Sequence, residues 1–162
     1  MPFSIRAATA DDAPCIVDLI NALARYERLE DESKPDEDVL RSQLSMDARP
    51  RIEALVAHET EGGKCIGFAL YFHNYSTFLT NFGLFLEDLF VDPAFRGQGV
   101  GLALLKQLAR IAAERGCKRL DWNVLDWNEL AISFYEKLGA SPQSDWITMR
   151  LGEEQIQEMA RS

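Results

Sequence analysis

The middle of the chain carries a strand, a glycine-rich turn and a helix in direct succession. The turn reads Arg96-Gly97-Gln98-Gly99-Val100-Gly101. Before it runs Leu84–Val91, a nearly continuous apolar segment that predicts a strand covered on both faces, ended by Pro93. After it, an apolar stripe at helical spacing predicts a helix that closes at Gly116: Leu104, Leu105, Leu108, Ile111 and Ala112. This succession constrains the chain to an α/β arrangement in which a sheet strand leads into a helix N-terminus.

The turn has the chemistry of an anion site. Glycines let the backbone take positive φ and approach a ligand, and consecutive N–H groups at a helix start attract phosphate. Arg96 adds a charged contact. A nucleotide-triphosphate loop would need Lys and then Ser or Thr, where this chain has Leu102 and Ala103. A dinucleotide fingerprint needs different glycine spacing. A plain helix-capping turn is the alternative, and it would account for one glycine.

Two carboxylates interrupt the apolar strand. Alternation predicts that Glu87 and Asp88 lie on opposite faces. A buried, unpaired carboxylate responds with a raised pKa, and such a group beside a ligand site suits general-base work. The alternative is a solvated strand end with two ordinary surface acids.

The rest of the chain continues the alternation of strands and helices. Strands are predicted at Phe3–Ala7, Arg51–Glu59, Lys64–Tyr75, Arg119–Leu125 and Trp146–Leu151, with a polar and aromatic loop at Asn74–Gly83. Helices are expected after the capping pair Thr9 and Asp12, after Pro35-Asp36, after Asn128 and from Glu153. We therefore expect one α/β (α+β) domain over residues 1–162, with a mixed sheet.

Composition narrows the function classes. The net charge is −9, with no basic stripe for nucleic acid, and an acidic field favours cationic small molecules. No segment is long and apolar enough for a signal peptide or a membrane span. Cys15, Cys65 and Cys117 are odd in number and widely spaced, which predicts reduced, buried thiols in a cytoplasm and no metal site. From the residues alone, Tyr135 is expected to be a core tyrosine with a satisfied hydroxyl.

Four ordered segments together resemble the GNAT superfamily of acetyltransferases over nearly the whole chain. They are Ile5–Thr9, Leu86–Val91, Arg96–Gly101 and Asn128–Ala140. Within the superfamily the sequence is most similar to the diamine (spermidine/spermine) and thialysine acetyltransferases, through Arg25-Tyr26-Glu27, Leu86-Glu87-Asp88 and Asp126-Trp127-Asn128-Glu129. The resemblance implies a mostly antiparallel central sheet with a splayed parallel strand pair, flanked by helices.

The resemblance also implies direct acetyl transfer from acetyl-CoA, as cosubstrate, to the primary amine of a small cationic metabolite, with no metal. Glu87 would help to deprotonate the substrate ammonium, and Tyr135 would protonate the departing thiolate. Tyr26, Glu27 and Glu87 would contact the amine. The residues implied to bind the coenzyme are Leu89, Phe90, Val91, Arg96, Gly97, Gln98, Gly99, Val100, Gly101, Leu102, Asn128 and Ala131.

One segment departs from the diamine enzymes, which carry a further acid in a longer Glu-Glu-Gly-Trp stretch. Here the chain reads Gln143-Ser144-Asp145-Trp146, so Asp145 is the candidate replacement. A protein lysine or N-terminal amine as substrate, and a non-catalytic acetyl-CoA-binding module, stay open as alternatives. The relatives imply a homodimer, with Phe78–Phe85 as one candidate interface segment.

Overall fold

The computed structural model describes residues 2–162 and divides the chain into two units. The first ends at Asn123 and the second runs from Val124 to Ser162.

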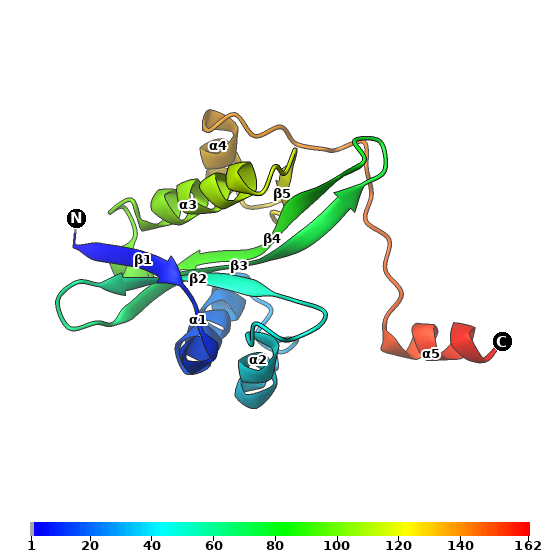
Figure 1. The fold of residues 1–162 in the computed structure, drawn as a ribbon, viewed down its shortest axis with the longest axis horizontal. Coiled ribbons are helices and arrows are strands. Elements are labelled where there is room, and N and C mark those ends of the chain that lie inside the picture. Colours follow the sequence, from blue (N-terminus) through cyan, green and yellow to red (C-terminus); the bar gives the residue numbers. More distant parts are fainter. Residues whose placement is uncertain (1) are drawn as a thin grey trace. The chain divides into compact units, whose positions relative to one another are not determined.

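The first unit is built on a five-stranded sheet in the order β1-β2-β3-β4-β5 (Figure 1). The strands are β1 (Phe3–Ala7), β2 (Glu53–Glu59), β3 (Cys65–Ser76), β4 (Asn81–Val91) and β5 (Leu120–Trp122). Neighbouring strands pair antiparallel, except that β4 and β5 are parallel. The predicted mixed, mostly antiparallel sheet with one parallel pair is confirmed.

Helices cover both faces of this sheet (Figure 1). On one face α1 (Ala13–Tyr26) and α2 (Glu37–Gln43) pack their apolar stripes against the strands. The core there comprises Ala13, Ile16, Leu19, Leu40, Leu44, Ala54, Val56, Phe68 and Phe90. On the other face α3 (Val100–Glu114) buries Val100, Leu104, Leu105, Leu108 and Ala112. Short 3-10 turns, η1 (Ala10–Asp12) and η2 (Pro93–Phe95), precede α1 and α3.

A glycine in β3 fixes how closely α3 approaches the sheet. A Cβ at Gly67 would lie 3.4 Å from side-chain atoms of both Val100 and Leu104, and 3.0 Å from the carbonyl oxygen of Phe90. The absence of a side chain there lets the first turns of α3 sit directly on the strands. The glycine turn before α3 is thereby held next to the end of β4.

The capping signals in the sequence act as expected. The carboxylate of Asp12 accepts the main-chain N–H of Thr9 at 2.7 Å, and that of Asp36 accepts the N–H of Val39 at 2.9 Å. Gly116 takes φ 70° just after α3. These contacts satisfy main-chain groups that helix ends leave without a helical partner.

The second unit holds two helices, α4 (Glu129–Lys137) and α5 (Glu153–Arg161). The side-chain oxygen of Asn128 accepts the N–H of Ala131 at 3.2 Å, so the predicted N-cap is confirmed. Gly139 follows α4 with φ 97°.

Four sequence-based expectations were wrong. The hairpin β3–β4 leaves only 77–80 as a turn, where a loop from Asn74 to Gly83 was expected, and β5 is shorter than predicted. Trp146–Leu151 forms no strand, and its side chains are exposed. The three cysteines are free thiols as expected, but each is half-buried instead of buried.

Within residues 2–162, no helix combines the length and apolar character that crossing a bilayer requires.

Candidate active site

A β-bulge in β4 marks the centre of the candidate site. Leu86 pairs with Tyr71 and Asp88 pairs with Leu70, so Glu87 is an extra residue without a partner on β3. A bulge bends its strand and redirects the side chains beside it. The two carboxylates singled out from the sequence therefore lie where the regular pleat of β4 is broken.

The same point is where β4 and β5 part. Their parallel pairing covers Leu84–Leu86 of β4 and stops there. In the part of the chain from residue 2 to residue 123, no strand pairs with the β5-side edge of β4 beyond Leu86. Main-chain groups of Leu89, Phe90 and Val91 along that edge can therefore take hydrogen bonds from an extended ligand. This is the splayed strand pair that the resemblance implied.

Asp88 is the more buried of the two acids. Burial raises its pKa from the ordinary 3.8 to about 6, and the negative charges of Glu87 and Glu27 add to that effect. The side chain of Glu87 is exposed. The sequence singled out both acids and assigned the general base to Glu87. It could not indicate that Asp88 is the more buried one, because that depends on the bulge.

Asp88 opens onto a small acidic cavity beside α1. The cavity has a volume of about 220 Å³ and is lined by Ile20, Leu23, Ala24, Glu27, Leu29, Glu32, Ser33 and Asp88. Burial also raises the pKa of Glu27. Apolar walls with three carboxylates suit a cationic amine, whose charge would relieve the repulsion between the acids.

The glycine turn has the backbone shape that an anion cradle needs. Gly97 and Gly99 have φ of 78° and 85°, a region that side chains disfavour. Gly99 is the N-cap of α3, and the first turn of that helix contains no acidic residue. The N–H groups of Val100, Gly101 and Leu102 begin the helix and have no helical acceptor. They are available, together with Gln98, to a diphosphate.

Arg96 joins this turn to α1. Its Nε donates a hydrogen bond to the carbonyl oxygen of Val91 at 3.2 Å. Its guanidinium carbon lies 4.7 Å from the ring centre of Tyr26 and 5.2 Å from that of Phe90. The structure thus brings Tyr26, expected at the substrate, against an arginine expected at the coenzyme. Stacking of this kind holds an arginine in a defined place.

The remaining predicted residues belong to the second unit. Asn128 caps α4 and Ala131 lies in its first turn. Tyr135 is half-buried on the same helix, with its ring 5.4 Å from that of Phe134. Asp145 lies in an exposed turn before Trp146. Glu87, Asp88, Glu27, Tyr26 and the glycine turn belong to the first unit, and the roles given to the second unit stay predictions.

Comparison with known proteins settles the family. The family model described as "Acetyltransferase (GNAT) family" matches residues 16–140. This protein belongs to the GNAT family of acetyltransferases. The matched segment of this GNAT chain contains the bulge, the glycine turn and α4.

Individual relatives agree with the family over almost the full length. The GNAT chain is 36% identical to a thialysine N-epsilon-acetyltransferase of Sus scrofa, over 96% of each chain. It is 33% identical to a human spermidine/spermine N(1)-acetyltransferase-like protein 1, over 98% of this chain and 24% of that one. A solved integron cassette protein from the mobile metagenome of V. cholerae superposes with a TM-score of 0.81 at 28% identity, covering 100% of this chain and 99% of that chain.

Within the described residues 2–162, no cluster of three or more His, Cys, Asp or Glu side chains is arranged to hold a metal ion.

Proposed function

We propose that this chain transfers an acetyl group from acetyl-CoA directly to the primary amine of a small cationic metabolite. The observation that carries the proposal is one junction in the fold. There the unpaired edge of β4 and the glycine turn before α3 follow one another within Glu87–Leu102, and Asp88 of the same stretch lines the acidic cavity beside α1.

Acetyl-CoA fits this junction by its own chemistry. Leu89, Phe90 and Val91 would bond the amide groups of the pantetheine arm along the open strand edge. The N–H groups from Gly97 to Leu102 would hold the diphosphate, with Arg96 adding charge. Asn128 and Ala131 are proposed as further contacts. The bound coenzyme supplies the activated acetyl thioester.

The acidic side chains would bind the substrate ammonium and remove its proton. An ammonium has no lone pair, so it must lose a proton before it can attack the thioester. Glu87, exposed at the bulge, is proposed to take that proton through water. Asp88 and Glu27 would hold the cation in the cavity, with Tyr26 beside it. Tyr135 is proposed to protonate the departing thiolate, and Asp145 to contact the far end of the substrate.

The acidic cavity and the relatives support the proposed substrate class. A polyamine, a diamine or a lysine analogue such as thialysine has a primary amine on a flexible apolar stem, which suits carboxylates set among apolar walls. We propose this class ahead of a protein lysine or N-terminus, because relatives that match nearly the whole chain are thialysine N-epsilon-acetyltransferases. We further propose that the protein is cytoplasmic, which the free cysteines support. We also propose that it is a homodimer, which the resemblance supports.

A pair of glycine substitutions at opposite ends of α3 tests the coenzyme site. Gly99→Ala and Gly116→Ala each place a side chain at positive φ, 85° and 70°, with no atom within 4 Å of the new Cβ. Both should lose about 1 kcal/mol of stability by backbone strain. Only Gly99→Ala should weaken binding of coenzyme A in calorimetry, by about tenfold or more, an affinity change of about 1.4 kcal/mol. Equal affinities in the two variants would contradict the cradle.

Kinetics with a panel of amines tests the chemistry. Thiol release from acetyl-CoA should be faster with thialysine, ornithine or spermidine than with lysine peptides. Glu87→Gln and Tyr135→Phe should lower kcat by about 10²-fold or more while coenzyme binding stays unchanged. Full turnover in both variants would refute the assigned roles. Coenzyme binding without thiol release, whatever the amine or peptide, would favour a non-catalytic binding module.

A further inference from the structure

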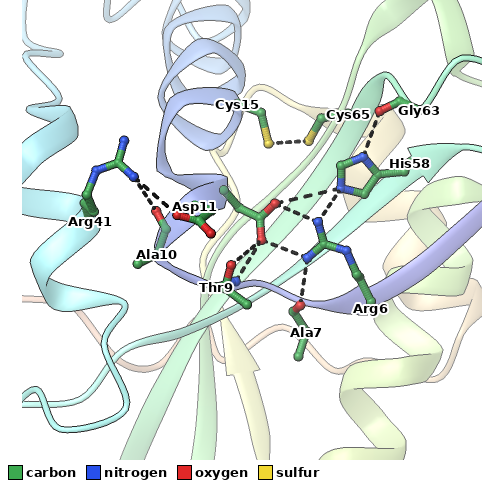
Figure 2. Close-up of polar contacts among 11 residues, drawn as sticks. Arg6, Ala7, Thr9, Ala10, Asp11, Cys15, Arg41, His58, Gly63 and Cys65 are labelled. Carbon is green, nitrogen blue, oxygen red and sulfur yellow. Dashed lines mark hydrogen bonds and ion pairs between the residues drawn. The ribbon is translucent and has the colours of Figure 1, made fainter.

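Two cysteines that the proposed acetyl transfer does not use lie in direct contact. Cys15 stands in the first turn of α1 and Cys65 begins β3, 50 residues later. Their Sγ atoms are 2.7 Å apart, and Figure 2 shows the two thiols pointing at each other from helix and strand. The two sulfurs are thus already in contact across the helix–strand boundary.

The pair is accessible to a small reagent. Both side chains are half-buried, and both line a cavity of about 710 Å³. Asp18, Arg25, Lys64 and Asp92 line the same cavity. These charged side chains stand beside apolar Leu19, Ala22 and Pro93 and let water and small polar solutes reach the thiols, whereas a thiol pair sealed in an apolar core would be inert.

The two sulfurs are not equivalent. Cys15 donates its S–H to Cys65, which also accepts a main-chain N–H from Gly67, and together these bonds lower the pKa of the Cys65 thiol. The pKa of Cys15 is raised because its proton is held in the same bond. Arg6 lies nearby, as Figure 2 shows, and its positive charge favours the Cys65 thiolate, while Asp12 opposes it. Because the main-chain N–H of Gly67 points to Cys65 and favours its thiolate, we assign Cys65 as the nucleophile and Cys15 as the thiol that resolves the product.

We propose that Cys15 and Cys65 form an oxidation site that takes hydroperoxides and closes to an intramolecular disulfide. The Cys65 sulfur attacks one peroxide oxygen, the O–O bond breaks, and the other oxygen leaves as water or an alcohol after taking a proton. Cys65 is then a sulfenic acid. The Cys15 sulfur attacks the Cys65 sulfur, an S–S bond forms, and the hydroxyl leaves as water with the proton of Cys15. Two thiols are oxidised and one peroxide is reduced.

The disulfide would fasten α1 to β3. Because α1 ends at Tyr26 and is followed by Glu27, the cross-link constrains the helix that carries two of the proposed amine contacts. The site itself is independent of the proposed acetyl transfer, since oxidation is read out on the thiols.

The full chain treated with one equivalent of hydrogen peroxide tests the site. Remaining thiols are blocked with N-ethylmaleimide and the protein is digested and mapped by mass spectrometry. We expect a cross-linked peptide pair containing Cys15 and Cys65, with Cys117 alkylated. Alkylation of both Cys15 and Cys65 after peroxide treatment would overturn the proposal, and so would a disulfide to Cys117 or between two copies.

Variants in a Cys117→Ser background assign the order of the steps. Cys15→Ser should leave Cys65 as a sulfenic acid that dimedone traps. Cys65→Ser should react with peroxide at least about tenfold more slowly, because the thiolate is then lost. Faster trapping on Cys15 than on Cys65 would overturn the assignment of the nucleophile. Mapping of the unmutated chain keeps the disulfide itself testable if either serine variant fails to fold.

Discussion

Replacement of Asp88 by asparagine should stabilise this protein at neutral pH while it weakens the proposed amine binding. The carboxylate is held in a partly buried site beside two other acids, and its pKa is raised from 3.8 to about 6. Each pH unit of such a change corresponds to about 1.4 kcal/mol, so ionising Asp88 costs the folded state about 3 kcal/mol more than the unfolded chain. The asparagine amide would keep the shape of the side chain and remove this cost.

The sign of the effect fixes its pH dependence. Below about pH 4 the carboxyl is protonated in both the folded and the unfolded chain, so it contributes nothing. As pH rises to about 6, the unfolded chain ionises first and the cost to the folded state grows. Above about pH 6 the cost is complete and constant. The Asp88→Asn variant should therefore gain up to about 3 kcal/mol over the wild type at pH 8, and almost nothing at pH 4.

Urea unfolding at a series of pH values measures this difference directly. Asp31→Asn, an exposed acid on the loop after α1, is the matched control and should track the wild type throughout. A stability difference for Asp88→Asn that stays the same from pH 4 to pH 8 would refute the reasoning. In the same variant the KM for the amine should rise about tenfold, because the cation loses one carboxylate contact. The gain in stability is thus accompanied by a loss of activity.

Three other substitutions, with Val39→Ala as a control, test contacts that hold the first unit together. Leu104→Ala removes a fully buried side chain and should lower the free energy of unfolding, measured by urea titration, by about 2–5 kcal/mol. The control Val39→Ala shortens an exposed side chain and should change it by under about 0.5 kcal/mol. Asp12→Asn should cost about 1–3 kcal/mol at pH 7 and less at pH 3, since the pKa of Asp12 is lowered by Arg6 and its contribution disappears as pH falls through that value. Gly83→Ala should cost about 1–3 kcal/mol by thermal melts, since its Cβ would lie 3.0 Å from the carbonyl oxygen of Arg119.

Local patterns predicted the elements whose partners are close in sequence or whose faces are strongly apolar. The helix stripe after the glycine turn became α3, and Thr9 with Asp12 marked the start of the first helical segment. The hairpin tip was missed because its mixture of polar and aromatic residues was interpreted as a loop. There Tyr75 pairs with Phe82, and the two rings pack edge to face at 5.1 Å. A cross-strand contact of this kind extends strands that propensity alone would end.

The bulge and the missing strand show the limit of alternation. A two-residue period gives Glu87 and Asp88 opposite faces, but it cannot reveal that one of them drops out of the pairing with β3. Trp146–Leu151 has a strand-like sequence, yet in this structure Trp146 is 76% exposed and no strand forms. Strand-forming residues favour an extended backbone, but a strand forms only where a neighbouring strand is available for pairing.

The parting of β4 from β5 carries a practical consequence for handling this protein. A strand edge with open N–H and C=O groups is a template on which other chains can add and start aggregates. If the coenzyme occupies the edge at Leu89–Val91, it fills those groups and adds its binding free energy to folding. Purification and storage with coenzyme A should then give a higher melting temperature and less precipitate than the ligand-free chain, and crystallisation should begin from the loaded form.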